Sequence, residues 1–129
     1  MNNDPLANVL SNINNAEKIG RKEVVVKPIS KIAKTILDLM KTHKYIEGYE
    51  EVQDGRGGQI IVKLSGKINK CAVIKPRLPV DKEGYEKFEK RHLPAKDFGF
   101  IVVTTPNGIM TQNEAKKKGI GGRVIAYVY

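Results

Sequence analysis

One stretch of sequence decides the fold of the C-terminal half, Phe98-Gly99-Phe100-Ile101-Val102-Val103-Thr104-Thr105-Pro106-Asn107-Gly108-Ile109-Met110-Thr111. Its dense run of β-branched residues from Phe98 to Thr104 predicts a strand that is buried on both faces. Asn107-Gly108 predicts a tight turn into a second stretch that begins at Ile109. The quoted residues therefore predict two strands joined by a short loop.

The residues after this stretch predict a helix and a last strand. Thr111 and Glu114 have the spacing of a capping box, in which a hydroxyl caps the helix and a carboxylate stands three residues later. Gly119 should end this helix, because glycine readily adopts the left-handed conformation that stops one. Arg123 to Tyr129 is expected to form the terminal strand.

The loop between the two strands has the chemistry of a binding surface. Small hydroxyl and amide side chains stand beside glycine from Thr104 to Gly108, and a basic cluster, Lys116–Lys118, follows. None of the strong acids or bases that catalysis needs lies in the loop. Such a surface can bring its backbone close to another polymer and hydrogen-bond it, which points to binding, with RNA as the partner.

The charge of the chain supports a polyanionic partner. The formal net charge is +9 and the isoelectric point is about 9.7. Residues 1–75 carry 13 basic and 8 acidic side chains, and residues 76–129 carry 10 and 6, so both halves are basic. A partner that touches both halves is one interpretation. A basic protein that is merely soluble is the other.

Cysteine usage and hydropathy exclude several classes of protein. Cys71 is the single cysteine, which excludes an internal disulfide and a cysteine-based zinc site. It lies in the apolar run Cys71-Ala72-Val73-Ile74, so we expect a small buried hydrophobic residue. No apolar stretch approaches the roughly 18 residues of a membrane span, and the polar start Met1–Asp4 is unlike a signal peptide. We expect a cytoplasmic chain with no cofactor and no metal site.

The first residues predict an amphipathic helix. Asp4 should cap it, with Pro5 at the first helical position. Leu6, Val9, Leu10 and Ile13 recur at helical spacing and form one buried stripe. The opposite face carries the polar residues Asn8, Ser11, Asn12 and Asn15. That face is either solvated or offers amide groups to a sugar-phosphate backbone.

A short strand, a second helix and three extended stretches are expected next. The strand covers Glu23–Lys27, and Ser30 should cap the helix. Its core-facing residues are Ile29, Ile32, Ala33, Ile36, Leu37 and Met40, while Lys31, Lys34, Asp38 and Lys41 lie outside that stripe. The three extended stretches, which we expect to form a meander with glycine-rich turns, are Tyr45–Val52, Gln59–Leu64 and Asn69–Lys75.

These elements predict an α+β protein built from two small α/β domains. Pro76-Arg77-Leu78-Pro79 breaks the pattern and marks the expected boundary. Residues 1–75 then form a domain of helix, strand, helix and meander. Residues 76–129 form a domain that is mostly β with short helices, one of them within residues 80–97 with Tyr85, Phe88 and His92 at helical spacing.

The motifs quoted so far resemble, in their order, a known family. The runs Val102–Thr111, Glu114-Ala115-Lys116 and Gly119–Tyr129 resemble the C-terminal signature of the universal small-subunit ribosomal protein eight. Asp4-Pro5-Leu6-Ala7-Asn8 and Ser30-Lys31 resemble its N-terminal part. The run from Pro76-Arg77 to Arg91-His92-Leu93-Pro94 is similar to the archaeal and eukaryotic branch. The resemblance spans nearly the whole chain.

This resemblance implies a structural ribosomal protein of the small (30S) subunit. Its fold would be two small α/β domains. It would bind an irregular helix in the central domain of small-subunit (16S) rRNA and help to assemble and stabilise the platform. Its other partners would be neighbouring small-subunit ribosomal proteins, including protein five, and it would be a monomer within the ribosome.

The resemblance also assigns the RNA-binding residues. It places the loop Thr104–Gly108 in the groove of the RNA helix. Many members have a serine where this chain has Pro106, so a hydroxyl contact is absent there, and Thr104, Thr105 and Asn107 would supply recognition. Gly121 and Gly122 either let the backbone approach the RNA or make the bend before the last strand. The full expected set is Asn12, Asn15, Ser30, Lys31, Lys34, Thr104, Thr105, Pro106, Asn107, Gly108, Lys116, Gly121, Gly122 and Arg123.

Three other functions are alternatives to rRNA binding. An enzyme is disfavoured because His43 and His92 have no partner at ligand or triad spacing. The glycine-rich runs at 55–58 and 119–122 lack the Lys-Ser/Thr pair of a nucleotide-binding loop. A basic DNA-binding module is an alternative, and so is a protein adaptor without a specific rRNA site.

Overall fold

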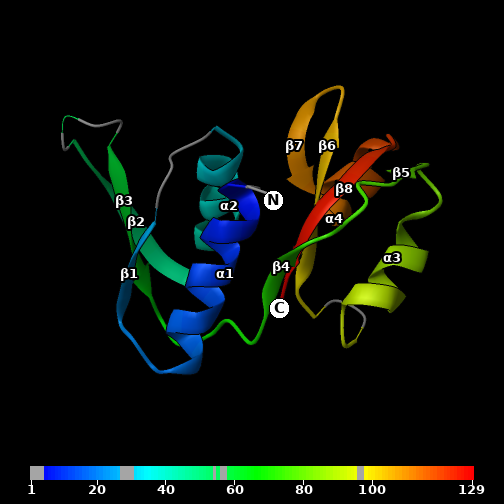
Figure 1. The fold of residues 1–129 in the computed structure, drawn as a ribbon. Coiled ribbons are helices and arrows are strands. Elements are labelled where there is room, and N and C mark those ends of the chain that lie inside the picture. Colours follow the sequence, from blue (N-terminus) through cyan, green and yellow to red (C-terminus); the bar gives the residue numbers. More distant parts are fainter. Residues whose placement is uncertain (1–4, 27–30, 54, 56–57, 96–97) are drawn as a thin grey trace. The chain divides into compact units, whose positions relative to one another are not determined.

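The computed structural model describes residues 5–26, 31–53, 55, 58–95 and 98–129. The chain divides into two compact units, Met1–Ala72 and Val73–Tyr129. Each unit contains both helices and strands, which confirms the α+β class (Figure 1).

The first unit packs two helices against a three-stranded antiparallel sheet. Helices α1 (Pro5–Lys18) and α2 (Lys31–Thr42) lie on one face of strands β1 (Glu23–Val26), β2 (Ile46–Val52) and β3 (Gln59–Leu64), as Figure 1 shows. The strand order is β1-β3-β2. These elements follow the predicted ranges closely because each buries an apolar face at its own period.

The apolar stripes of both helices form the core of this unit. The predicted stripe of α1 is buried, and α2 buries four of the residues expected of it. Ile32 is half-buried. The expected capping residues Asp4 and Ser30, like Ile29, lie outside the described residues. The buried side chains are Leu6, Val9, Leu10 and Ile13 from α1, and Ala33, Ile36, Leu37 and Met40 from α2.

The prediction of a three-strand meander is wrong for one of its strands. The third predicted stretch forms β4 (Cys71–Val73), which belongs to the other sheet. The strand that pairs with β3 on the side opposite β2 is β1. The chain after β3 is tied to α1: the Ile68 N–H donates to the Glu17 carboxylate at 3.1 Å, and the Cys71 N–H donates to the side-chain oxygen of Asn14 at 3.4 Å. These bonds lead the segment along α1 instead of back onto β3.

The second unit is a sheet with two short helices. Its strands are β6 (Phe100–Thr105), β7 (Gly108–Thr111) and β8 (Gly122–Val128), and its sheet also includes β4, of which only Val73 belongs to this unit; the order is β4-β8-β6-β7. A two-residue strand that the sequence did not predict, β5 (Pro79–Val80), pairs with β8. The helices are α3 (Tyr85–His92) and α4 (Gln112–Lys118). Both were predicted, and the cap of α4 is confirmed, because the Thr111 hydroxyl accepts from the Glu114 N–H at 3.3 Å.

Both helices of the second unit pack on one apolar face of its sheet. Tyr85 and Phe88 of α3 and Ala115 of α4 join a buried cluster with Ile101 and Val103 of β6. A row of rings continues this cluster. His92 stacks on Tyr127 with ring centroids 5.2 Å apart, and Tyr127 stacks on Tyr129 at 6.0 Å. Burial, together with the nearby charge of Arg91, lowers the pKa of His92.

A chain of polar contacts ties both helices to the sheet. Gln112 is buried, and its side-chain oxygen accepts from the Ile101 N–H at 2.7 Å. Its amide nitrogen donates to the Glu89 carboxylate at 3.2 Å, and the same carboxylate pairs with Lys116. Because a buried polar group without a partner is costly, this arrangement holds α3 and α4 in one position relative to β6.

The cysteine is buried in the first unit, as predicted. Cys71 is 2% exposed, and its Sγ–H donates to the Leu10 carbonyl oxygen at 3.3 Å. Burial, and to a smaller degree the Glu17 carboxylate, raises the pKa of Cys71 to about 12. The thiolate, which is the reactive form, is therefore rare at neutral pH.

We predict slow alkylation of Cys71 in the folded protein. At pH 8 its reaction with iodoacetamide should be slower than in the urea-unfolded chain by roughly 10³-fold, since a pKa about three units above that of a free thiol reduces the thiolate fraction by that factor. The folded rate should keep rising with pH up to the pKa of the thiol. Mass spectrometry of timed samples measures both rates. Equal rates in the two states would show that the thiol is accessible.

Candidate nucleic-acid interface

The loop between β6 and β7 is a tight connection with a defined shape. The two strands pair up to Thr105 and Gly108, so Pro106 and Asn107 alone make the turn. Gly108 has φ of +112°, a conformation that side chains rarely adopt. Proline is favoured at the second position of such turns and glycine at the fourth. Pro106, Asn107 and Gly108 are exposed, so the tip of the loop is open to a partner.

Thr105 holds this loop from the inside. Its hydroxyl donates to the Gly108 carbonyl oxygen at 2.8 Å and accepts from the Asn107 N–H at 3.1 Å. The residue is only 9% exposed. The hydroxyl that the sequence suggested for RNA recognition is therefore used within the loop, where it fixes the shape of the turn at Pro106 and Asn107.

The two glycines before β8 are explained by packing within the protein. A Cβ on Gly121 would lie 2.5 Å from the Val80 carbonyl oxygen, and one on Gly122 would lie 2.1 Å from the Thr104 carbonyl oxygen. Both obstacles are backbone atoms of neighbouring strands. The sequence left open an approach to RNA or a bend before the last strand; the structure adds a third explanation, the close approach between the protein's own strands, which accounts for these residues without any RNA.

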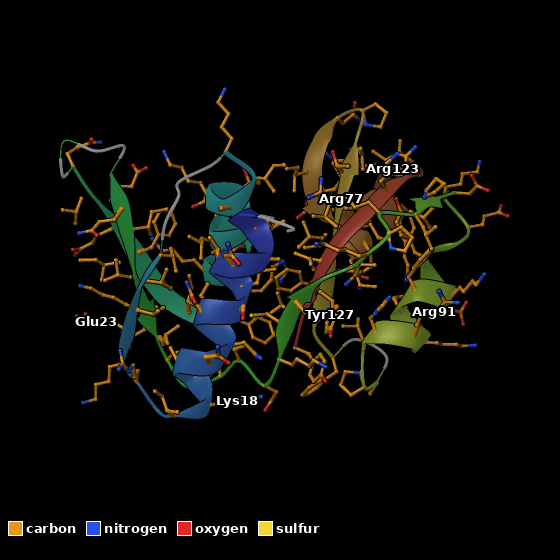
Figure 2. The ribbon with its side chains drawn as sticks, viewed as in Figure 1. Lys18, Glu23, Arg77, Arg91, Arg123 and Tyr127 are labelled. Carbon is orange, nitrogen blue, oxygen red and sulfur yellow. The ribbon has the colours of Figure 1, made fainter. Side chains whose placement is uncertain are left out.

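Two arginines lie at β8, the strand that pairs with the loop-bearing strand β6. Arg123 of β8 stands opposite Thr104 of β6, and its guanidinium donates to the Arg77 carbonyl oxygen at 3.0 Å. The Val124 N–H donates to the Leu78 carbonyl oxygen at 3.1 Å, so the segment with Arg77 runs along β8 (Figure 2). Both arginines are exposed. Arg77 was missing from the expected site, because its proline-rich surroundings suggested only a boundary.

A comparison with protein families shows the family to which this chain belongs. A family model described as ribosomal protein S8 matches residues 4–129. The chain belongs to the ribosomal protein S8 family. It is thus a structural small-subunit ribosomal protein that binds rRNA and other ribosomal proteins, located in the cytoplasmic ribosome. Within the described part of the chain, no helix is long and apolar enough to cross a membrane.

The lysines of this ribosomal protein S8 family member differ in their availability for phosphates. Lys116 is ion-paired with Glu89, and Lys34 is ion-paired with Glu51. Lys31 is exposed and makes no ion pair among the described residues. Lys117 and Lys118 are exposed at the end of α4. The paired lysines must give up a partner before they can meet a phosphate, which favours the other three.

The expected site residues of this family member fall into two groups. Thr104–Gly108, Lys116, Gly121, Gly122 and Arg123 lie in the second unit, where β6 and β8 bring the loop, the glycines and Arg123 together. Asn12, Asn15, Lys31 and Lys34 lie in the first unit, with both asparagines exposed on α1. Ser30 lies outside the described residues.

Proposed function

We propose that the chain binds an irregular helix in the central domain of small-subunit rRNA and helps to assemble and stabilise the platform of the subunit. The loop at Pro106–Gly108 enters the RNA groove. The observation that carries this proposal is a preformed, exposed loop on β6 and β7, with the exposed Arg123 on the neighbouring strand β8, in a member of an rRNA-binding family. The run Pro76–Pro94 supports a place in the archaeal and eukaryotic branch, and protein five is the expected protein neighbour.

The loop suits the shallow minor groove of A-form RNA. That groove displays 2′-hydroxyl groups, whereas the base edges of the major groove are too deep for side chains to reach. The Asn107 amide can donate to and accept from a 2′-hydroxyl through a short side chain, which loses little rotamer freedom on binding. Pro106 offers a rigid surface to the sugars. Specificity for an irregular helix then comes from the fit of a fixed loop to a groove of unusual shape.

The exposed cations would position the protein along the RNA backbone. Arg123 stands opposite Thr104 of β6, Arg77 lies next to Arg123 on the other edge of β8, and Lys117 and Lys118 extend from α4. Contacts with phosphates fix register and orientation but carry no sequence information. In this arrangement the cations supply most of the affinity, while the loop selects the site.

Footprinting on total rRNA tests this function. Hydroxyl-radical cleavage with the full-length chain should protect one discrete site in the central domain of small-subunit rRNA. Excess duplex DNA at physiological salt should leave that protection in place. Protection at another site, or its removal by the DNA, would contradict the proposal and favour a general nucleic-acid binder.

We predict different salt dependences for two lysine variants. Lys31→Ala should reduce the slope of log K against log salt concentration by about 0.7–0.9, because one phosphate contact is lost. Lys34→Ala is the matched control on the same helix and should change the slope much less, since Lys34 is already paired with Glu51. Filter-binding titrations across a salt series measure both slopes. Equal reductions would show that the ion pair does not distinguish these lysines.

A further inference from the structure

The two edge strands of the first unit differ in how they are protected. β2 carries Glu47, Glu50 and Glu51 and has a register irregularity between Ile46 and Gly48. Charges and bulges of this kind prevent a sheet edge from pairing with another chain. β1 reads Glu-Val-Val-Val and pairs with β3 without any shift. Val25, in the middle of β1, is 50% exposed. The edge at β1 therefore has one carboxylate, Glu23, and no bulge, whereas the edge at β2 has three carboxylates and a bulge.

The register of β1 shows which backbone groups face this open edge. The Leu64 N–H donates to the Lys22 carbonyl oxygen at 2.8 Å, which makes these two residues a hydrogen-bonded pair. Hydrogen-bonded and non-hydrogen-bonded pairs alternate along an antiparallel ladder. Val24 and Val26 are then bonded to β3, and the N–H and C=O groups of Glu23 and Val25 point outward. Two donors and two acceptors stand there at strand spacing.

A hollow with apolar and amide groups lies beside the same edge. It has a volume of about 550 Å³ and is lined by residues of α1, the turn after it and β1, including Asn12, Asn15 and Ile19. Ile19 is 69% exposed. Glu23 makes no ion pair among the described residues, and Figure 2 shows it at the start of β1. Arg21 also lines this hollow, which therefore offers an apolar surface, two amides, one carboxylate and one guanidinium.

We propose that this edge takes up an extended segment of a neighbouring ribosomal protein as an added β-strand. The proposal rests on membership of the ribosomal family and is independent of the RNA site in the second unit. The added strand would place an apolar side chain beside Ile19 and Val24, which line the hollow, and on its other face an apolar side chain beside Val25 and a lysine or arginine beside Glu23. Backbone hydrogen bonds would supply affinity and the side chains specificity.

A peptide fits this edge better than RNA does. The outward N–H and C=O groups of Glu23 and Val25 alternate at strand spacing, as those of a peptide backbone do, whereas the phosphates of RNA only accept and its backbone donors are limited to the 2′-hydroxyls. Asn12 and Asn15, which the sequence suggested for RNA, line the hollow and can bond a peptide backbone in the same way.

Hydrogen exchange of the β1 amides tests the proposal directly. The probe is the full chain in three states: free, bound to small-subunit rRNA alone, and within a small subunit reconstituted with all its proteins. In the peptide covering residues 19–26, the amides of Glu23 and Val25 should exchange freely in the first two states. They should be slowed by roughly tenfold or more only in the complete subunit. Protection already present with rRNA alone would assign the edge to RNA, and no protection in the subunit would leave it without a partner; either result overturns the proposal.

A backbone substitution provides the second measurement. Val25→Pro removes the outward N–H without removing a bond to β3, and proline is tolerated on an edge strand in that orientation. Val25→Thr is the matched control, because it keeps the N–H and the β-branched shape. Val25→Pro should dissociate from the reconstituted subunit roughly tenfold faster than Val25→Thr, as expected for one lost hydrogen bond, with unchanged affinity for rRNA alone. Equal dissociation rates would overturn the proposal, and the exchange measurement stands even where the proline variant fails to fold.

Discussion

Replacing Gly122 with alanine is expected to lower the free energy of unfolding by about 3 kcal/mol or more. The added Cβ would lie 2.1 Å from the Thr104 carbonyl oxygen and 3.0 Å from its carbon. Both are backbone atoms of β6, so no side chain can rotate away. β6 and β8 would have to separate where they pair, next to fully buried residues such as Val103 and Val124. Urea unfolding followed by circular dichroism measures the loss.

Gly119→Ala is the matched control for this prediction. Gly119 ends α4 at φ of +66° and has open space around its Cα. Alanine there meets only the cost of the left-handed conformation, about 1–2 kcal/mol. If Gly122→Ala destabilised the protein no more than Gly119→Ala, close packing of β6 against β8 would not be the reason for Gly122.

The difference between these two glycines shows what the sequence could predict. Gly119 follows a capped helical pattern, so the residues just before it in the sequence predict its role of ending the helix. Gly122 is explained by Thr104, 18 positions away, through a strand pairing. Local periods and turn residues therefore predicted most helices and strands. They could not place β4 or reveal β5, because those depend on contacts with distant residues.

For the candidate site too, local sequence patterns predicted some features, but features that depend on distant contacts could not be predicted. The exposed tip at Pro106 and Asn107 follows from turn chemistry, and the sequence identified it. Whether a lysine is available depends on its neighbours in space: Lys116 meets Glu89 from α3, which no pattern around Lys116 reveals. Arg77 was overlooked for the same reason, since only the folded chain brings it to Arg123.

Thr105→Val is expected to weaken binding to the cognate rRNA helix by roughly 30-fold. Valine keeps the shape of threonine but loses the hydroxyl that donates to Gly108 and accepts from Asn107. Each of these bonds contributes about 1 kcal/mol, and about 2 kcal/mol corresponds to that factor in the dissociation constant. Because Gly108 and Asn107 are exposed, water can replace the lost partners in the free protein. The loop would then have to be ordered again when it binds.

Thr105→Ser separates this effect from a direct contact between the residue and RNA. Serine keeps the hydroxyl and both internal bonds, so its affinity for the cognate helix should stay within about threefold of the original chain, well under the cost of a lost hydrogen bond. Binding of either variant to a generic RNA duplex should change little, because phosphate contacts dominate there. Equal losses for valine on both RNAs would mean that the loop does not select the site. A loss for serine as large as that for valine would mean that the methyl group of Thr105, rather than its hydroxyl, shapes the loop.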